Sequence, residues 1–201
     1  MTAHTRPVNR HRKKFMFSAI CSWILKALGW KIVIEDPCVS RYVLIVAPHT
    51  SNWDFLLGIA AAKAIRLDAH FIAKHTLFRK PFGWVFRGLG GIPVHRGQGR
   101  NLSEQMAEHF RSRDHFILGM APEGTRSKLN HWKTGFYYIA RVAEVPIVMA
   151  FLDYGRKEVG MGGAFMPTGD LEECFEKIRE FYSGRVAKKP ENASEVRPKS
   201  S

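Results

Sequence analysis

The sequence has few cysteines and lacks several patterns that mark common classes of site. Its 201 residues include three cysteines, widely spaced and without a CxxC pair. No disulfide framework is therefore expected, and Cys21, Cys38 and Cys174 are predicted to be small buried groups in a reducing compartment. Neither an HExxH pattern nor a cluster of Cys and His is present, so we expect no metal and no bound cofactor. The absence of a G-x-S-x-G elbow leaves a serine-hydrolase interpretation without its nucleophile.

Acidic residues are also scarce, with 18 Asp and Glu against 31 Lys and Arg, which gives a net charge of +13. Such a surface attracts nucleic acid, an anionic membrane or phosphorylated substrates. No RNA-recognition, zinc-finger or helix-turn-helix signature accompanies the charge, so no nucleic-acid partner is expected. A basic lipid-binding or nucleic-acid-binding module without catalysis stays as an alternative, as does a soluble basic protein.

The N-terminal region combines positive charge with an apolar stretch. Residues 1–14 carry five Arg and Lys and no acid, and residues 15–30 are apolar except for polar positions that recur every four residues. This spacing predicts a helix with one narrow polar stripe, which is shorter than the ~20 residues that span a bilayer. We expect residues 1–30 to lie in the headgroup layer, peripherally, on the cytoplasmic face of a membrane. The alternatives are a helix buried on the core and a signal peptide, against which Lys26 and Trp30 argue.

Beyond this region, strand-like and helix-like segments alternate, and residues 31–183 are predicted to form one domain. The alternation predicts an α/β fold with a mostly parallel central sheet flanked by helices. Sites in such sheets form in the loops that follow the carboxyl ends of strands. The polar residues 184–201 are predicted to be a disordered tail. The expected strands are 42–47, 70–74, 91–95, 116–121 and 145–151, and the expected helices are 54–66, 101–113, 134–144 and 170–182.

The most informative segment is His-Thr-Ser-Asn-Trp-Asp at 49–54, which leaves a buried strand and enters a helix. Ser51 or Asn52 can cap that helix, which puts Asp54 in or near its first turn. The Asp54 carboxylate could then accept a hydrogen bond from one nitrogen of His49 and leave the other nitrogen basic. With no protein nucleophile, the proton that His49 removes would belong to a substrate hydroxyl. The alternative is a structural or solvated histidine.

Three further segments contain candidate anion-binding residues. Pro-Glu-Gly-Thr-Arg-Ser at 122–127 follows a buried strand and offers backbone N–H groups and the planar fork of Arg126 for a phosphate. Arg96, in the segment 90–96, and Lys133, in 131–135, are candidates of the same kind. For each, an ordinary turn or a solvated surface residue is the alternative.

Together, the blocks 49–54, 91–96, 122–127 and 145–148 (H-x4-D, G…R, P-E-G-T-R-S and V-P-I-V) resemble those of the glycerolipid acyltransferases related to 1-acyl-glycerol-3-phosphate acyltransferase. The resemblance implies an O-acyltransferase of phospholipid biosynthesis. Its donor would be acyl-CoA or an acyl carrier protein, and its acceptor the hydroxyl of a lysophospholipid or glycerol-phosphate-like molecule. It also implies that His49 is the general base with Asp54 as its partner, and that the acceptor phosphate is held by Arg96, Glu123, Gly124, Thr125 and Arg126.

The sequence departs from the family pattern at three places. Pro-Val-His-Arg at 93–96 stands where Phe-Ile-Asp-Arg is usual, and Ala121 and Met149 replace a common Phe and Pro. The catalytic pair is unaffected, but an acyltransferase acting on an unphosphorylated acceptor remains an alternative. The acyl length and the choice between CoA and carrier protein stay open.

Overall fold

The computed structural model describes residues 8–79, 81, 83–94 and 102–199. These residues form one sheet of seven strands in the order β1-β7-β6-β2-β5-β3-β4. All neighbouring pairs are parallel except β6 and β7, which are antiparallel. The strands are β1 (Lys31–Ile34), β2 (Arg41–Ala47), β3 (Ala69–Lys74), β4 (Gly91–Val94), β5 (Phe116–Met120), β6 (Ile147–Asp153) and β7 (Glu158–Phe165). The predicted α/β fold with a mostly parallel sheet is confirmed.

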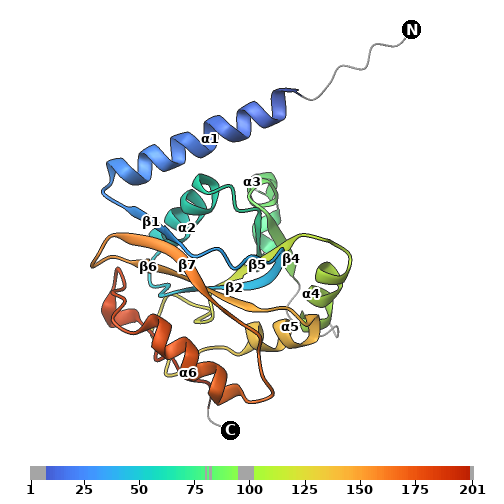
Figure 1. The fold of residues 1–201 in the computed structure, drawn as a ribbon, viewed down its shortest axis with the longest axis vertical. Helices are drawn as coiled ribbons and strands as arrows, with labels where there is room; N and C mark the ends of the chain where they lie inside the picture. The colour runs from blue at the N-terminus through green and yellow to red at the C-terminus, as the bar shows by residue number, and fades with distance from the viewer. Residues whose placement is uncertain (1–7, 80, 82, 95–101, 200–201) are drawn as a thin grey trace.

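Helices cover both faces of the sheet (Figure 1). On one side lies α2 with α1 packed against it, and on the other lie α4, α5 and α6. The helices are α1 (Val8–Ala27), α2 (Asn52–Ala64), α3 (Gly83–Gly88), α4 (Leu102–Arg111), α5 (Gly135–Ala143) and α6 (Leu171–Tyr182), with short 3-10 turns η1 (His75–Phe78) and η2 (Pro190–Asn192). Every strand and helix predicted beyond residue 30 is present, with its ends shifted by at most two residues.

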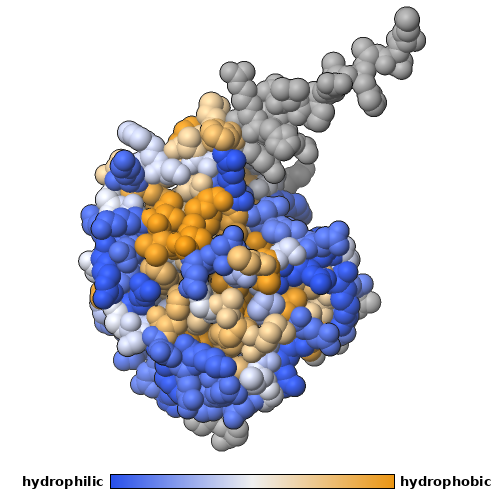
Figure 2. Space-filling model, in the orientation of Figure 1, coloured by the Kyte–Doolittle hydropathy of each residue, from blue (hydrophilic) through white to orange (hydrophobic). Residues whose placement is uncertain are grey.

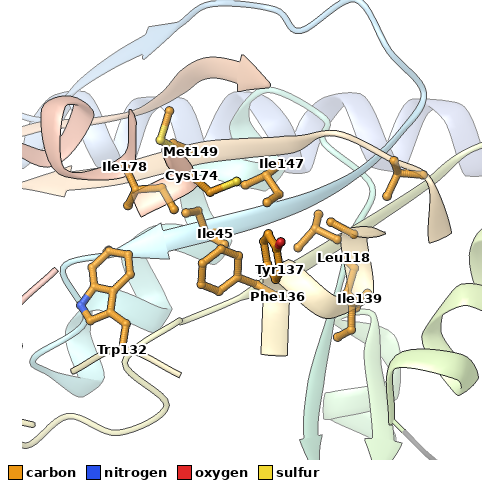
Figure 3. Packing of buried hydrophobic residues seen from close by; sticks show 14 of the residues in the cluster. Ile45, Leu118, Trp132, Phe136, Tyr137, Ile139, Ile147, Met149, Cys174 and Ile178 are labelled. Atoms are coloured by element: carbon orange, nitrogen blue, oxygen red, sulfur yellow. The ribbon is translucent and has the colours of Figure 1, made fainter. Parts of the chain in front are cut away.

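The core follows from the alternation of side chains along buried strands. In β2, Val43 and Ile45 face α4, α5 and α6, whereas Tyr42 and Leu44 face the side of α2. Figure 3 shows side chains of β2, β5, β6, α5 and α6 meeting in the larger cluster. In α6, Asp170 caps the first turn, and Cys174, Phe175 and Ile178 lie on the buried face. Both sides of the central strands are thus removed from water, which explains their unbroken apolar runs.

Strands β1 and β7 and helix α3 escaped the sequence analysis. In β7, three of eight residues are glycine, and glycine is unfavourable in an isolated strand. The reason for Gly160 lies across the sheet, since a Cβ there would stand 1.9 Å from the carbonyl oxygen of Val33 in β1. The pairing of β7 with β1 therefore depends on a close backbone contact that no local pattern reveals.

Helix α1 packs in an unexpected orientation. Three residues of this helix face the domain: Ser18 donates a hydrogen bond to the Ala64 carbonyl, and Cys21 and Leu25 are buried. Two positions of the predicted polar stripe, Ser18 and Ser22, thus lie on or beside the packed face. Most of the large apolar residues of α1 and its C-terminal end are exposed instead, namely Phe15, Met16, Phe17, Ile20, Trp23, Ile24 and, directly after the helix, Leu28. Among the described residues, no helix combines the length and the apolar character needed to cross a membrane.

Two predictions from the sequence were wrong. Cys38 is exposed, in the connection from β1 to β2, although Cys21 and Cys174 are buried as expected. The C-terminal segment, defined here as residues 184–199, was predicted to be disordered but packs on the domain. Its backbone pairs with Tyr154 and Trp132, and Ala187 is buried. The prediction was based on the low apolar content of this segment. It was wrong because specific hydrogen bonds, rather than a large apolar face, hold the segment on the domain.

Candidate active site

The site residues lie at one edge of the sheet, where three neighbouring parallel strands end. His49 and Asp54 follow β2, Glu123 and Arg126 follow β5, and Tyr154 follows β6. Strand β2 lies between β5 and β6 and is parallel to both, so the three carboxyl ends meet. Open α/β sheets place their ligand sites at this edge.

The start of α2 fixes the geometry around Asp54. Ser51 is the N-cap, and Asp54 forms the other half of a capping box in the first turn, as predicted. The Asp54 Oδ2 atom accepts hydrogen bonds from the backbone N–H groups of Thr50 and Ser51, each at 2.7 Å. The carboxylate therefore holds the loop that carries His49 as well as the helix end.

His49 and Asp54 lie close together without a direct hydrogen bond. The His49 Nδ1 atom is 3.7 Å from Asp54 Oδ2, too long for a hydrogen bond but within the range of charge attraction. The His49 side chain is 20% exposed and that of Asp54 is fully buried. Burial lowers the pKa of His49, Asp54 opposes this, and Arg126 lowers it further. A lowered pKa favours the neutral imidazole, the form in which Nε2, the nitrogen that does not face Asp54, could accept a proton.

Tyr154 is a third member of this group. Its hydroxyl donates a hydrogen bond of 2.6 Å to Asp54 Oδ1. Burial raises the pKa of Tyr154 well above its usual value, and the hydrogen bond to Asp54 raises it further, so the hydroxyl keeps its proton. Asp54 therefore accepts three hydrogen bonds, two on Oδ2 and one on Oδ1. Sequence reasoning missed Tyr154, although its position directly after a buried strand was a usable signal.

Glu123 lies behind His49 rather than in an open site. Its carboxylate Oε1 accepts a hydrogen bond from the backbone N–H of His49 at 3.0 Å, and the residue is only 1% exposed. Burial raises its pKa to about 7, against the smaller opposing effect of that hydrogen bond. No described group lies within hydrogen-bonding distance of its other oxygen, Oε2. The structure thus gives no support to the prediction that Glu123 binds substrate, and its contact with His49 indicates a positioning role.

Arg126 reaches from the loop after β5 to the start of α2. Its Nη1 donates a hydrogen bond to Asn52 Oδ1, and its side chain is exposed. It lines a cleft beside the His49 loop and lowers the pKa of His49. The predicted anion-binding arginine and the predicted base are therefore brought to the same place.

The other predicted loop residues shape the same turn. Gly124 has φ +65°, and a Cβ there would lie 2.7 to 2.9 Å from the side chain of Lys133. Lys133 thus lies over Gly124 and is not among the residues that line the cleft. The Thr125 hydroxyl accepts a hydrogen bond from the Ser127 N–H at 3.3 Å. These contacts explain why the turn has a glycine at position 124 and a hydroxyl residue at position 125.

Arg96 lies outside the described residues, so its predicted role is untested. The described residues contain no group of three or more His, Cys, Asp or Glu that could hold a metal ion. Besides Tyr154, the site includes residues that the sequence did not suggest, namely Thr50, Trp53, Lys188, Lys189 and Asn192, which line the cleft with Arg126. The C-terminal lysines carried no local signal.

Comparison with known proteins identifies the family and the fold. The sequence pattern of the Acyltransferase family matches residues 31–151, more than half of the chain. The chain belongs to the Acyltransferase family. No curated protein matches the sequence significantly. Among solved structures, this acyltransferase is similar to the 1-acyl-sn-glycerophosphate (LPA) acyltransferase PlsC from Thermotoga maritima. The TM-score is 0.58 at 19% identity, over 90% of this chain and 86% of the other. The resemblance seen in the sequence is thereby confirmed for family and fold.

Proposed function

We propose that this acyltransferase moves a fatty-acyl group from acyl-CoA or an acyl carrier protein to the hydroxyl of a lysophospholipid or similar phosphate-bearing acceptor. One observation carries the proposal: the partly exposed imidazole of His49 stands beside the buried carboxylate of Asp54 at the sheet edge, next to Arg126. The fold shared with an LPA acyltransferase supports this class of acceptor.

The reaction requires one proton transfer and one acyl transfer. His49 Nε2 removes the proton of the acceptor hydroxyl, and the oxygen attacks the carbonyl carbon of the thioester. The tetrahedral intermediate collapses with cleavage of the C–S bond, and the leaving thiolate takes the proton from the imidazolium. Asp54 stabilises that imidazolium, as the carboxylate does in a catalytic triad. The 3.7 Å separation suits an enzyme without substrate, because catalytic contacts often tighten only in the complex.

The exposed face of α1 supports the proposal that the enzyme acts at a membrane surface. Six large apolar side chains of this helix, and that of Leu28 directly after it, are exposed, while Ser18, Cys21 and Leu25 are buried. In Figure 2 apolar surface gathers over α1 and below it. Val33 and Ile34 of β1 are further exposed apolar residues. An apolar helix face beside a strongly basic chain suits the headgroup layer of an anionic membrane. The unpaired thiols suit its cytoplasmic side.

The decisive experiment is mass spectrometry of lipids after incubation of the purified protein with a panel of lysolipids and acyl donors. We expect an acylated product from phosphate-bearing acceptors. The His49→Ala variant should retain less than about a tenth of the rate, because general-base catalysis contributes ~10²–10⁴-fold. His115→Ala, an exposed residue before β5, is the matched control. Equal activity of the His49→Ala variant and the wild type would contradict the proposal.

Asp54→Asn is a less specific test. Asp54 accepts hydrogen bonds from two backbone N–H groups and from Tyr154. An amide has a single acceptor oxygen and would direct N–H groups at some of these donors. The variant would lose stability as well as catalysis, so thermal unfolding must accompany its kinetics.

A further inference from the structure

A cleft of about 400 Å³ lies beside the proposed catalytic loop. Three separate parts of the chain line it: the residues around the start of α2, the loop after β5, and the C-terminal segment. The lining residues are Thr50, Ser51, Asn52, Trp53, Arg126, Lys188, Lys189 and Asn192. Thr50 is the residue directly after His49, so the cleft lies next to the loop that carries the proposed base, although His49 itself does not line it.

The C-terminal segment is fixed on both sides of the cleft. Before the lysines, the backbone of Val186 exchanges hydrogen bonds with the end of β6, through Tyr154 N–H and Asp153 Oδ1. After them, the Ser194 hydroxyl accepts a hydrogen bond from Leu129 N–H, and the Arg197 carbonyl accepts one from Trp132 N–H. The two lysines are therefore carried by an anchored backbone.

Lys188 and Lys189 are held at the cleft by direct contacts with the catalytic loop and α2. The backbone N–H of Lys189 donates a hydrogen bond of 3.2 Å to the Thr50 hydroxyl, and Thr50 is buried. The Lys188 ammonium lies 4.9 Å from the ring centre of Trp53, in a cation–π contact. Both ammonium groups are on exposed residues. The two lysine side chains thus lie at the cleft, and their ammonium groups remain accessible to a bound anion.

The charges that line the cleft have one sign. Arg126, Lys188 and Lys189 supply three positive charges, and none of the lining residues is acidic. Hydroxyl and amide groups from Thr50, Ser51 and Asn52 add hydrogen-bonding capacity. Converging cations with polar neighbours bind phosphate through charge-assisted hydrogen bonds. A cleft of this composition therefore selects an anion.

We propose that Lys188 and Lys189, together with Arg126, form a phosphate-binding subsite that holds a phosphate group of one substrate beside His49. The inference rests on the proposed acyl transfer, because that reaction supplies the phosphorylated molecules. Both substrates carry phosphate, since a lysophosphatidate has one on its glycerol and CoA has several. The shared chemistry is a phosphate ester, and the experiment distinguishes the two sources.

The first test measures binding alone, so that it does not depend on catalysis. Calorimetric titration of glycerol 3-phosphate, and separately of CoA, into the His49→Ala protein gives reference affinities. Adding Lys188→Gln and Lys189→Gln to that background should weaken one of the two probes by roughly tenfold, the effect expected for two partly exposed charge-assisted contacts. Loss for glycerol 3-phosphate identifies the acceptor subsite, and loss for CoA identifies the donor subsite.

Matched variants separate the subsite from general charge. Lys177 on α6 and Lys199 are exposed lysines outside the cleft lining, so Lys177→Gln with Lys199→Gln removes the same charge elsewhere. This control should bind both probes as the reference protein does. Lys188→Arg with Lys189→Arg should restore binding. Equal affinity of the Gln variant and the reference for both probes would overturn the proposal.

The second test uses the catalytically active chain. If the subsite holds the acceptor, Lys188→Gln with Lys189→Gln raises KM for lysophosphatidic acid and leaves KM for monoacylglycerol unchanged. If it holds the donor, KM rises for acyl-CoA and not for an acyl thioester of N-acetylcysteamine, which has no phosphate. An equal loss with phosphorylated and unphosphorylated substrates would indicate a structural role and overturn the proposal.

A loss that affects only the binding of anionic vesicles would also overturn the proposal, because it would assign the two lysines to a membrane-binding surface. If the wild-type protein shows no acyltransferase activity, the proposed function is wrong. The binding test still shows whether the subsite binds phosphate, because it does not depend on catalysis.

Discussion

The Tyr154 hydroxyl donates a hydrogen bond to Asp54 Oδ1 at 2.6 Å, although the two residues are 100 positions apart. It joins the end of β6 to the first turn of α2 across the proposed site. Together with the two backbone donors on Oδ2, it fixes the orientation of the carboxylate that faces His49. Tyr154 thus acts on the proposed base through Asp54.

Replacing Tyr154 by Phe should therefore lower kcat and leave KM nearly unchanged. The expected loss is roughly ten- to a hundredfold, because hydrogen bonds to charged groups contribute about 1.5–3 kcal/mol. Steady-state kinetics with thermal unfolding of the same sample measure both effects. Tyr138→Phe, on the exposed side of α5, is the control. A variant with normal kcat and reduced stability would show that the hydroxyl is only structural.

Arg126→Gln should shift the acid limb of the rate profile to higher pH. Burial is the main cause of the lowered pKa of His49, but Arg126 contributes to it, so its removal raises that pKa. Since the reaction needs the neutral imidazole, the variant should lose activity at a higher pH than the wild type does. The pH dependence of kcat/KM reports this shift, and Arg111→Gln on α4 is the control. An unshifted acid limb would show that Arg126 does not influence the pKa of His49.

Glu123→Gln should change the pH dependence of stability. Burial raises the pKa of Glu123 from 4.5 to about 7, so the folded chain binds its proton more tightly than the unfolded chain does. The wild type therefore loses stability as pH rises through this range, whereas the Gln variant lacks that loss. Relative to the wild type, the variant should gain about 2–3 kcal/mol in free energy of unfolding between pH 5 and pH 8. Urea denaturation at both pH values measures it, with the exposed Glu176→Gln as control. If the difference in free energy of unfolding between the variant and the wild type is the same at pH 5 and pH 8, Glu123 is ionised over this whole range.

Acidic substitutions on the exposed face of α1 should release the protein from anionic vesicles. Trp23 is 70% exposed and Ile20 is 46% exposed, so Trp23→Glu with Ile20→Glu leaves the packed side intact. Vesicle sedimentation should show much weaker binding at an unchanged melting temperature. Tyr138→Glu, on a helix that covers the opposite face of the sheet, is the control. Unchanged sedimentation would rule out α1 as the membrane contact. Deletion of the helix is a poorer test, because Leu25 belongs to a core cluster.

The sequence predicted what short-range patterns determine. The apolar runs of β2, β5 and β6 identified the central strands, because burial on both faces leaves no polar position. The capping pattern placed Asp54 in the first turn of α2, and four short motifs identified the family. Each of these signals spans fewer than about ten residues.

The features that escaped prediction depend on residues far apart in the chain. Tyr154 meets Asp54 only because β6 lies beside β2, and Gly160 is explained only by the backbone of β1. The C-terminal segment has few apolar residues and no periodicity, so its composition resembled a tail. Its order comes from individual hydrogen bonds to Thr50, Leu129 and Trp132, which no local pattern encodes.

The bond between Lys189 and Thr50 joins positions 139 residues apart, and this separation sets an order of events during synthesis. Helix α1 precedes every strand in the chain, so it leaves the ribosome while the sheet is still untranslated. The lining of the cleft, in contrast, is not complete until translation has passed residue 192, which comes after every strand. Nascent chains fold from the N-terminal side. The proposed membrane-contacting helix is therefore synthesised before the residues that complete the proposed phosphate subsite.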